Sequence, residues 1–192
     1  TSGGIVPLGN PDRIQSASAQ KWGKYNVDGL DNLADGFATI HGGYDPVYAN
    51  ESPDRVVPLD ALRELEKEGV IGGVYKDFYT TTGTGTAVGN SIKFGAEMGK
   101  ELKEAGVGTC TRCGATMVKE IEKYGIPIVH MATITTISQS VGANRIVPTV
   151  SIPYPVGNPE LGEKEGELRM KMVKKALEAL STEVEEPTIF QV

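Results

Sequence analysis

Cysteine, histidine and tryptophan are almost absent from this sequence. Its 192 residues include two cysteines, two histidines and one tryptophan. Two neighbouring cysteines cannot crosslink a disulfide-rich secreted scaffold, so we expect the reducing environment of the cytoplasm. A structural zinc site needs four ligands, and His41 and His130 lie far apart and show no ligand spacing. No metal site is therefore predicted.

The sequence also lacks a long apolar run and an excess of positive charge. A membrane-spanning helix needs roughly 20 consecutive apolar residues, and no such stretch or signal-peptide pattern is visible. The formal net charge is −6, which disfavours nucleic acid or an anionic membrane surface as the main partner. We expect a protein that binds neither.

Glycine, in contrast, is abundant and clustered. The 24 glycines gather in stretches such as "TSGG", "HGGY" and "TTTGTGT", which we interpret as shaped loops between elements. Bare N–H groups and hydroxyls in such loops can surround a carboxylate or a phosphate. None of the stretches matches a P-loop or a G-x-G-x-x-G fingerprint, so no bound nucleotide cofactor is predicted.

Hydrophobic periodicity predicts helices alternating with short strands. The length fits one domain spanning residues 1–192, of class α/β with a mostly parallel sheet flanked by helices in Rossmann-like or flavodoxin-like layers. The charges of 163–175 should form a solvated helix face. The predicted helices are 58–69, 87–106, 160–181 and one from the cysteines to Gly125; the predicted strands are 70–75, 126–132 and 145–152; and 1–13, 45–55 and the last residues are predicted loops or tail.

One connection breaks this alternation. The helix ending near Gly106 leads through "VGTC" into the next helix with no strand between them. Consecutive helices of a parallel α/β unit normally need one. Either the two helices form a local pair, or a strand-length segment is absent at Val107–Gly108.

Both cysteines stand at the start of a predicted helix, as Cys110-Thr-Arg-Cys113. The helix N-terminus and Arg112 favour the thiolate, so a redox-active pair able to exchange with a disulfide or selenenyl sulfide is the first hypothesis. The alternative is a pair of small buried thiols, because free cysteine is among the most buried residue types.

Several loops carry candidate substrate-binding residues. In "HGGYD", His41 is a candidate acid–base group or carboxylate ligand beside Gly42, Gly43 and Tyr44, although a tight turn capped by Asp45 explains the same pattern. His130, inside an apolar run, is more typical of a satisfied core residue. The further candidates for substrate binding are Thr81 and Thr82 in the threonine-rich loop, and Asn144 and Arg145, of which the arginine suits a carboxylate.

Five stretches together point to a family. They are "TSGGIVPLGNPDRI", "ADGF", "HGGYDPVYAN", "GTCTRCGATMVKEIE" and "GANRIVP" followed by "IPYPVGNP". The chain resembles, over essentially its whole length, the C-terminal half of the selenocysteine-containing B component of glycine, sarcosine and betaine reductases. The D-proline reductase subunit shares "HGGYD" and "GTC" more loosely. In the family, a strand ending in selenocysteine directly precedes "GTC", giving U-x-x-C-x-x-C, whereas here Val107 stands three residues before Cys110.

The resemblance implies an enzyme of the amino-acid reductase class, which reductively cleaves the C–N bond of glycine or an N-methylated glycine. It implies a selenolate nucleophile just before Gly108, a pyruvoyl-type carbonyl on a companion subunit, and Cys110 and Cys113 as the resolving thiols. Further implied partners are selenoprotein A, an acetyl-phosphate-forming component and a thioredoxin-type electron donor, all in an oligomeric complex. Two other functions fit the residues: a plain thiol–disulfide oxidoreductase, and a non-catalytic substrate-binding or scaffold subunit.

Overall fold

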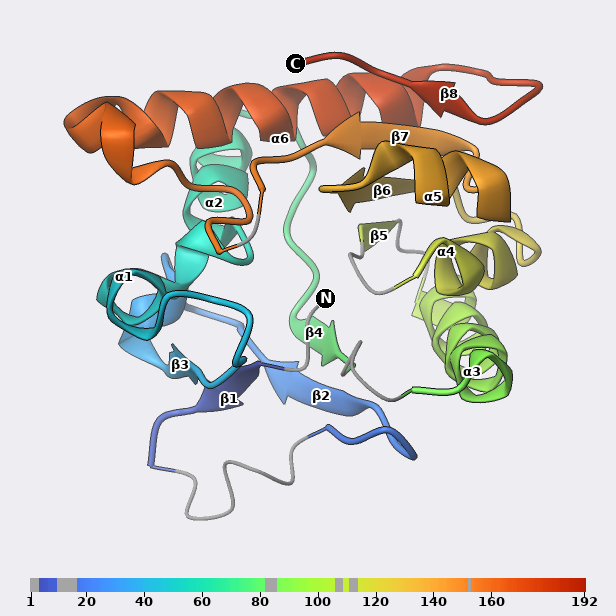
Figure 1. Ribbon diagram of the computed structural model, residues 1–192, viewed down its shortest axis with the longest axis horizontal. Helices are drawn as coiled ribbons and strands as arrows, with labels where there is room; N and C mark the ends of the chain where they lie inside the picture. Colours follow the sequence, from blue (N-terminus) through green and yellow to red (C-terminus); the bar gives the residue numbers. More distant parts are fainter. Residues whose placement is uncertain (1–3, 10–16, 82–85, 106–108, 111–113, 152) are drawn as a thin grey trace.

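A parallel sheet covered by helices on both faces organises the C-terminal part of the molecule. The computed structural model describes residues 4–9, 17–81, 86–105, 109–110, 114–151 and 153–192, without the side chains of 109 and 110. Its largest sheet has four parallel strands in the order β5-β6-β7-β8 (Figure 1). Their bounds are β5 Thr109–Cys110, β6 Ile128–Ala132, β7 Arg145–Pro148 and β8 Thr188–Ile189.

Different helices pack against the two faces of this sheet. Alternate residues of a strand point to opposite faces, so Ile128 and Ile146 pack in one cluster with the helices α3 and α4, while Val129 and Met131 pack in another with α6. All five residues of β6 are buried, as expected for a strand covered on both sides. The helices are α3 Val88–Ala105, α4 Ala115–Glu122, α5 Thr135–Val141 and α6 Glu165–Ser181.

The N-terminal part adds two antiparallel strand pairs. Strand β1 (Ile5–Pro7) pairs with β3 (Phe37–Thr39), and β2 (Gly23–Asn26) pairs with β4 (Asp77–Thr80). The rings of Tyr25 and Phe37 lie 5.7 Å apart and join the pairs. The remaining elements are the helices α1 Pro46–Glu51 and α2 Leu59–Lys67 and the 3-10 turns η2 Leu33–Asp35, η3 Pro53–Arg55 and η4 Pro159–Lys164.

The α/β class and the parallel sheet confirm the prediction, and so do the main helices. The predicted helices 58–69, 87–106 and 160–181 correspond to α2, α3 and α6, and the predicted strand 126–132 is β6. The predicted strand 145–152 ends early, at Pro148. The first turn of 160–181 is 3-10 rather than α, since Gly162 has φ 53°.

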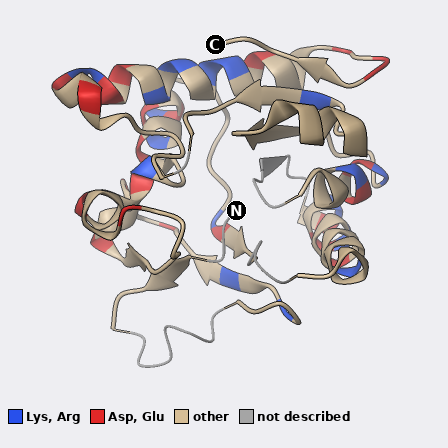
Figure 2. Ribbon diagram, viewed as in Figure 1, with Lys and Arg blue, Asp and Glu red and all other residues tan. Residues whose placement is uncertain are grey.

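Five local predictions are wrong in whole or in part. Residues 70–75 form bends and irregular structure rather than a strand, with Val70 58% exposed. The tail contributes β8 through pairing with β7. The predicted loop 45–55 holds α1 and η3, and the predicted loop 1–13 holds strand β1, which pairs with β3. The solvated face of 163–175 is interrupted, because Glu165 and Arg169 are buried among the alternating charges of α6 seen in Figure 2.

The gap predicted between the helices at Val107 is partly filled. The two-residue strand β5 pairs with β6 in the register Thr109–Ile128 and Cys110–Val129. Alternation of helix and strand is therefore kept, and the described residues of β5 pair with Ile128 and Val129 at the start of β6. Among the described residues, no helix is long and apolar enough to span a membrane.

Helices α3 and α4 cross where a side chain would not fit. A Cβ on Gly95 would lie 2.8 Å from Cβ of Glu120 and 3.1 Å from the backbone of Met117, whereas a Cβ on Gly89 would have no heavy atom within 4 Å. We predict that Gly95→Ala lowers the free energy of unfolding by roughly 1–3 kcal/mol through overpacking. Gly89→Ala, in the same helix, should be neutral or stabilise by up to about 1 kcal/mol. Urea unfolding of both variants checks this, and equal effects would contradict the close crossing.

Candidate active site

Both cysteines precede α4 in the sequence. Cys110 ends β5, beside Val129 of β6, while Cys113 and the side chain of Cys110 lie outside the described residues. Gly114 caps α4 with φ 99°, a conformation that only glycine adopts without strain. In the sequence, Cys113 directly precedes the cap residue of an eight-residue helix.

His41 sits in a turn built by the surrounding "HGGYD". Its Nδ1 accepts a hydrogen bond from the Gly43 N–H at 3.0 Å, and its ring lies 4.6 Å from the ring of the buried Tyr44. The Asp45 carboxylate caps α1 by accepting from the N–H groups of Val47 and Tyr48. The turn with an Asx-type cap is thus present. Because Nδ1 accepts, the neutral ring carries its proton on Nε2.

The strand pair β1–β3 brings the two glycine-rich stretches together. Ile5 pairs with Thr39, and the Ile40 N–H donates to the Gly4 carbonyl at 2.7 Å. A Cβ on Gly4 would stand 2.3 Å from Cβ of His41. The last residue of "TSGG" therefore packs directly against His41, a contact that the sequence spacing does not reveal.

The threonine-rich loop begins with buried residues. Thr80, at the end of β4, and Thr81 after it are 0% and 1% exposed, and Thr82 lies outside the described residues. Thr81 lines the large cavity described below. A buried hydroxyl there can orient a ligand.

The side chains of Asn144 and Arg145, predicted to bind substrate, make hydrogen bonds within the protein. Asn144 Nδ2 donates to Oε2 of Glu122 at 2.7 Å, and Arg145 Nη1 donates to Oε1 of the same carboxylate at 3.1 Å. Arg145 also donates to the Thr182 carbonyl. Burial is the main cause that raises the pKa of Glu122, with Arg145 opposing it. Both residues stand where β7 begins, whereas ligands of parallel sheets bind at the carboxyl ends of strands. Their substrate role remains a prediction without support from this geometry.

His130 lies in the middle of β6 and is 5% exposed. It alternates with Val129 and Met131, so it shares the face of Ile128 and points toward the α3–α4 side. This agrees with a core histidine. No group of three or more His, Cys, Asp or Glu side chains that could hold a metal ion is found in the described part of the chain.

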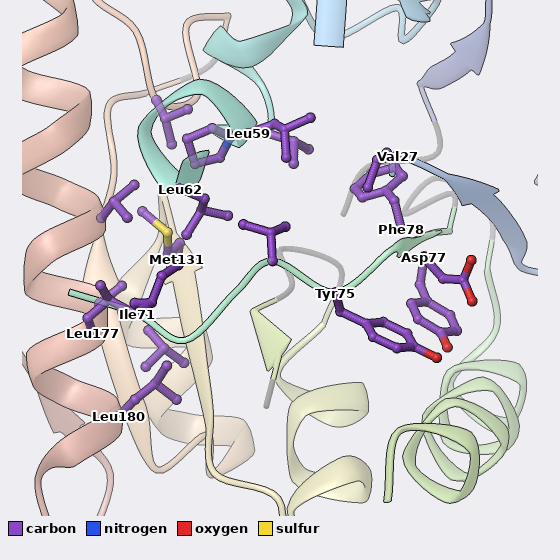
Figure 3. A pocket seen from close by; sticks show the side chains of 18 of the residues that line it. Val27, Leu59, Leu62, Ile71, Tyr75, Asp77, Phe78, Met131, Leu177 and Leu180 are labelled. Carbon is purple, nitrogen blue, oxygen red and sulfur yellow. The ribbon is translucent and has the colours of Figure 1, made fainter. Parts of the chain in front are cut away.

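A large apolar cavity adjoins the sheet. Its volume is about 620 Å³, which is within the range of ligand pockets. Figure 3 shows Leu62 of α2, Met131 of β6 and Leu177 of α6 gathered around one part of it. Few polar groups line it. Sequence reasoning missed it, because its walls come from distant segments whose apolar residues all look like ordinary core.

Comparisons with known proteins identify the family of this chain. A family model described as glycine/sarcosine/betaine reductase selenoprotein B matches residues 1–114, more than half of the chain. The chain belongs to this family. The predicted resemblance is therefore confirmed. No solved structure matches the chain.

Individual members of the selenoprotein B family are similar over the whole chain. Three such relatives come from Peptoclostridium acidaminophilum. The glycine reductase complex component B subunit gamma is 61% identical, the sarcosine reductase complex component B subunit beta 54%, and the betaine reductase complex component B subunit beta 53%. Each match covers 100% of this chain and 46% of the relative, so the chain spans about half the length of these relatives.

The alignments also contain positions that this chain lacks. The match to the glycine reductase subunit extends over 202 positions although all 192 residues of the chain are covered. At least ten positions therefore hold residues of the relative alone.

Proposed function

We propose that this chain is part of a component B subunit of a glycine-, sarcosine- or betaine-type reductase and takes part in reductive C–N bond cleavage. The observation that carries the proposal is the 61% identity to a glycine reductase component B subunit across the entire chain. The substrate is glycine or one of its N-methylated derivatives. The partners are the other components of such a complex.

The cysteine pair supplies electrons in this proposal. Cys110 and Cys113 lose two electrons and two protons as their disulfide forms, and a thioredoxin-type donor returns both by thiol–disulfide exchange. The helix that starts after Gly114 supports this role, because its dipole stabilises the attacking thiolate.

Two groups that the proposed reaction needs are not among the 192 residues of the printed sequence. A selenocysteine among the additional positions of the relatives would supply a nucleophile for the α-carbon, and a pyruvoyl-type carbonyl of a companion subunit would activate the substrate nitrogen. Within the chain, the "HGGYD" turn fits the placement of a small carboxylate: the neutral His41 ring carries its proton on Nε2, a donor of the kind that a carboxylate accepts from, and Gly42 is exposed.

Substitution of the cysteines in the complex reconstituted with its companion components tests the function. Cys110→Ser and Cys113→Ser should each lower the steady-state release of ammonia or methylamine by a factor on the order of 10² or more. The double variant should be no worse, because residues that act as one unit fail together.

Assays with three substrates and an assay of disulfide reduction distinguish the proposed function from its two alternatives. Assays with glycine, sarcosine and betaine identify the substrate by the amine released. Activity only as a disulfide reductase, without amine release, would favour the plain oxidoreductase. Full amine release by both serine variants would contradict the redox role and leave a scaffold subunit.

A further inference from the structure

Two glycines pack so closely against His41 that neither has room for a side chain. A Cβ on Gly4 would stand 2.3 Å from Cβ of His41 and 2.9 Å from its backbone nitrogen. A Cβ on Gly43 would stand 3.0 Å from Cε1 and 3.1 Å from Nδ1 of the ring. A Cβ on Gly42, in contrast, would have no heavy atom within 4 Å. Contact with the histidine thus explains glycine at positions 4 and 43 but not at position 42.

The two glycines constrain different parts of the histidine. Gly4 directly precedes β1 and constrains the backbone, because its carbonyl accepts from the Ile40 N–H at 2.7 Å and leaves His41 beside it. Gly43 constrains the ring, because its N–H donates to Nδ1 at 3.0 Å. A methyl group at position 43 would push on the same ring atom that accepts this hydrogen bond. The place of Cβ and the direction of the ring are therefore set by one glycine each.

The surroundings of this contact are themselves fixed. The buried Tyr44 lays its ring 4.6 Å from the His41 ring. Asn50 of α1 binds both backbone polar groups of Thr39: its Oδ1 accepts from the N–H at 2.8 Å, and its Nδ2 donates to the carbonyl at 3.0 Å. Because Thr39 is the last residue of β3, helix α1 anchors the strand end from which His41 follows. Packing of this kind restricts a side chain to one rotamer.

We propose that Gly4 and Gly43 are positioning residues that hold the His41 imidazole in one orientation and one neutral tautomer, with Nδ1 as acceptor and Nε2 as donor. The hydrogen bond made by one ring nitrogen decides which nitrogen carries the proton. The proposal rests on the function proposed above, in which His41 helps to place a small carboxylate. A carboxylate only accepts hydrogen bonds, so a ring fixed as a donor before the substrate arrives lowers the cost of binding. Both glycines act through His41.

Nitrogen NMR of the imidazole tests the positioning directly, with His41→Ala to assign its signals. The unmodified protein should show one neutral tautomer protonated on Nε2. Gly43→Ala should make the second tautomer measurable and speed exchange of the residue-43 amide at least about tenfold, because its hydrogen bond to Nδ1 is weakened. Gly42→Ala adds the same methyl group to open space and should change neither readout. Equal spectra of all three proteins would overturn the proposal, and so would equal changes in both variants.

Substrate kinetics in the reconstituted complex connect the positioning to binding. Gly4→Ala and Gly43→Ala should each raise KM for the amino-acid substrate by about tenfold, the effect of weakening one hydrogen bond to a charged group. The kcat should stay within about twofold, because a contact made equally in the ground state and the transition state affects KM alone. Gly166→Ala, at an open position of α6, should change neither constant. A fall in kcat at constant KM would contradict the positioning role.

The His41→Ala background separates positioning from plain stability. This variant retains the Cβ that a side chain at position 4 would meet, so Gly4→Ala should lower the unfolding midpoint equally in both backgrounds. Its effect on KM should vanish without the imidazole, and a persistent effect would overturn the proposal. If Gly4→Ala does not fold, Gly43→Ala provides the same comparison. If the unmodified complex releases no amine, the proposed function fails, and the NMR spectra still decide whether the glycines position His41.

Discussion

Glu165→Ala should lower the free energy of unfolding by about 3–5 kcal/mol, the usual cost of breaking a buried ion pair. Glu165 is 7% exposed. Its Oε2 accepts from Arg55 Nε at 2.9 Å, and its Oε1 accepts from the Asn158 N–H at 3.0 Å. Removal of the carboxylate leaves the Arg55 guanidinium, held 4.0 Å from the Tyr48 ring, with the exposed Glu51 carboxylate as its remaining ion-pair partner. The N-terminal part would thereby lose an ion pair that connects it directly to α6.

The neighbouring Glu167 provides a matched control. Both glutamates lie in the first turn of α6 and interact equally with its dipole, but Glu167 is exposed. Glu167→Ala should change the free energy of unfolding by no more than about 0.5 kcal/mol. Urea unfolding of the two variants measures the difference. A cost below about 1 kcal/mol for Glu165→Ala, as for a surface pair, would show that this contact does not hold the two parts together.

The thiols should react as thiolates near neutral pH. A thiol at a helix N-terminus in a C-x-x-C pair has a pKa near 7 rather than about 8.5. We predict that the rate of alkylation by iodoacetamide, followed against pH, has its midpoint about one unit or more below that of an ordinary cysteine. At pH 7 this should give a several-fold faster reaction, since the larger thiolate fraction outweighs its lower intrinsic nucleophilicity.

A cysteine at the other end of a helix is the control. In a chain with Cys110→Ser and Cys113→Ser, the variant Ser181→Cys places one exposed thiol at the last residue of α6. The negative end of the dipole should keep its midpoint at or above about 8.5. Identical midpoints, or thiols in the native chain that resist alkylation while it is folded, would support the buried-thiol alternative instead.

Elements with a strong hydrophobic pattern were predictable from the sequence. The leucine stripe of α2 and the unbroken apolar run of β6 each satisfy one structural rule along their whole length. The two-residue strands β5 and β8 have no pattern long enough to detect. Thr188–Ile189 becomes a strand only because the edge of β7 offers it hydrogen-bonding partners.

The candidate site was predictable in its motifs but not in its arrangement. "HGGYD" marked a real turn around His41, whereas the contact between Gly4 and His41 depends on pairing of β1 with β3. Arg145 looked free to bind a carboxylate, but the burial of Glu122 beside it required the folded chain. The break in alternation predicted near Val107 contains the two-residue strand β5, which is too short for any sequence pattern to indicate.

The mass of the tryptic peptide that ends at Arg112, taken from the native protein of the source organism, tests the central claim most directly. In the sequence printed here this peptide is "EAGVGTCTR", following Lys103. We predict a longer peptide with the isotope pattern of selenium ahead of Cys110. A peptide of the printed length without selenium would contradict a selenol–thiol centre in this chain.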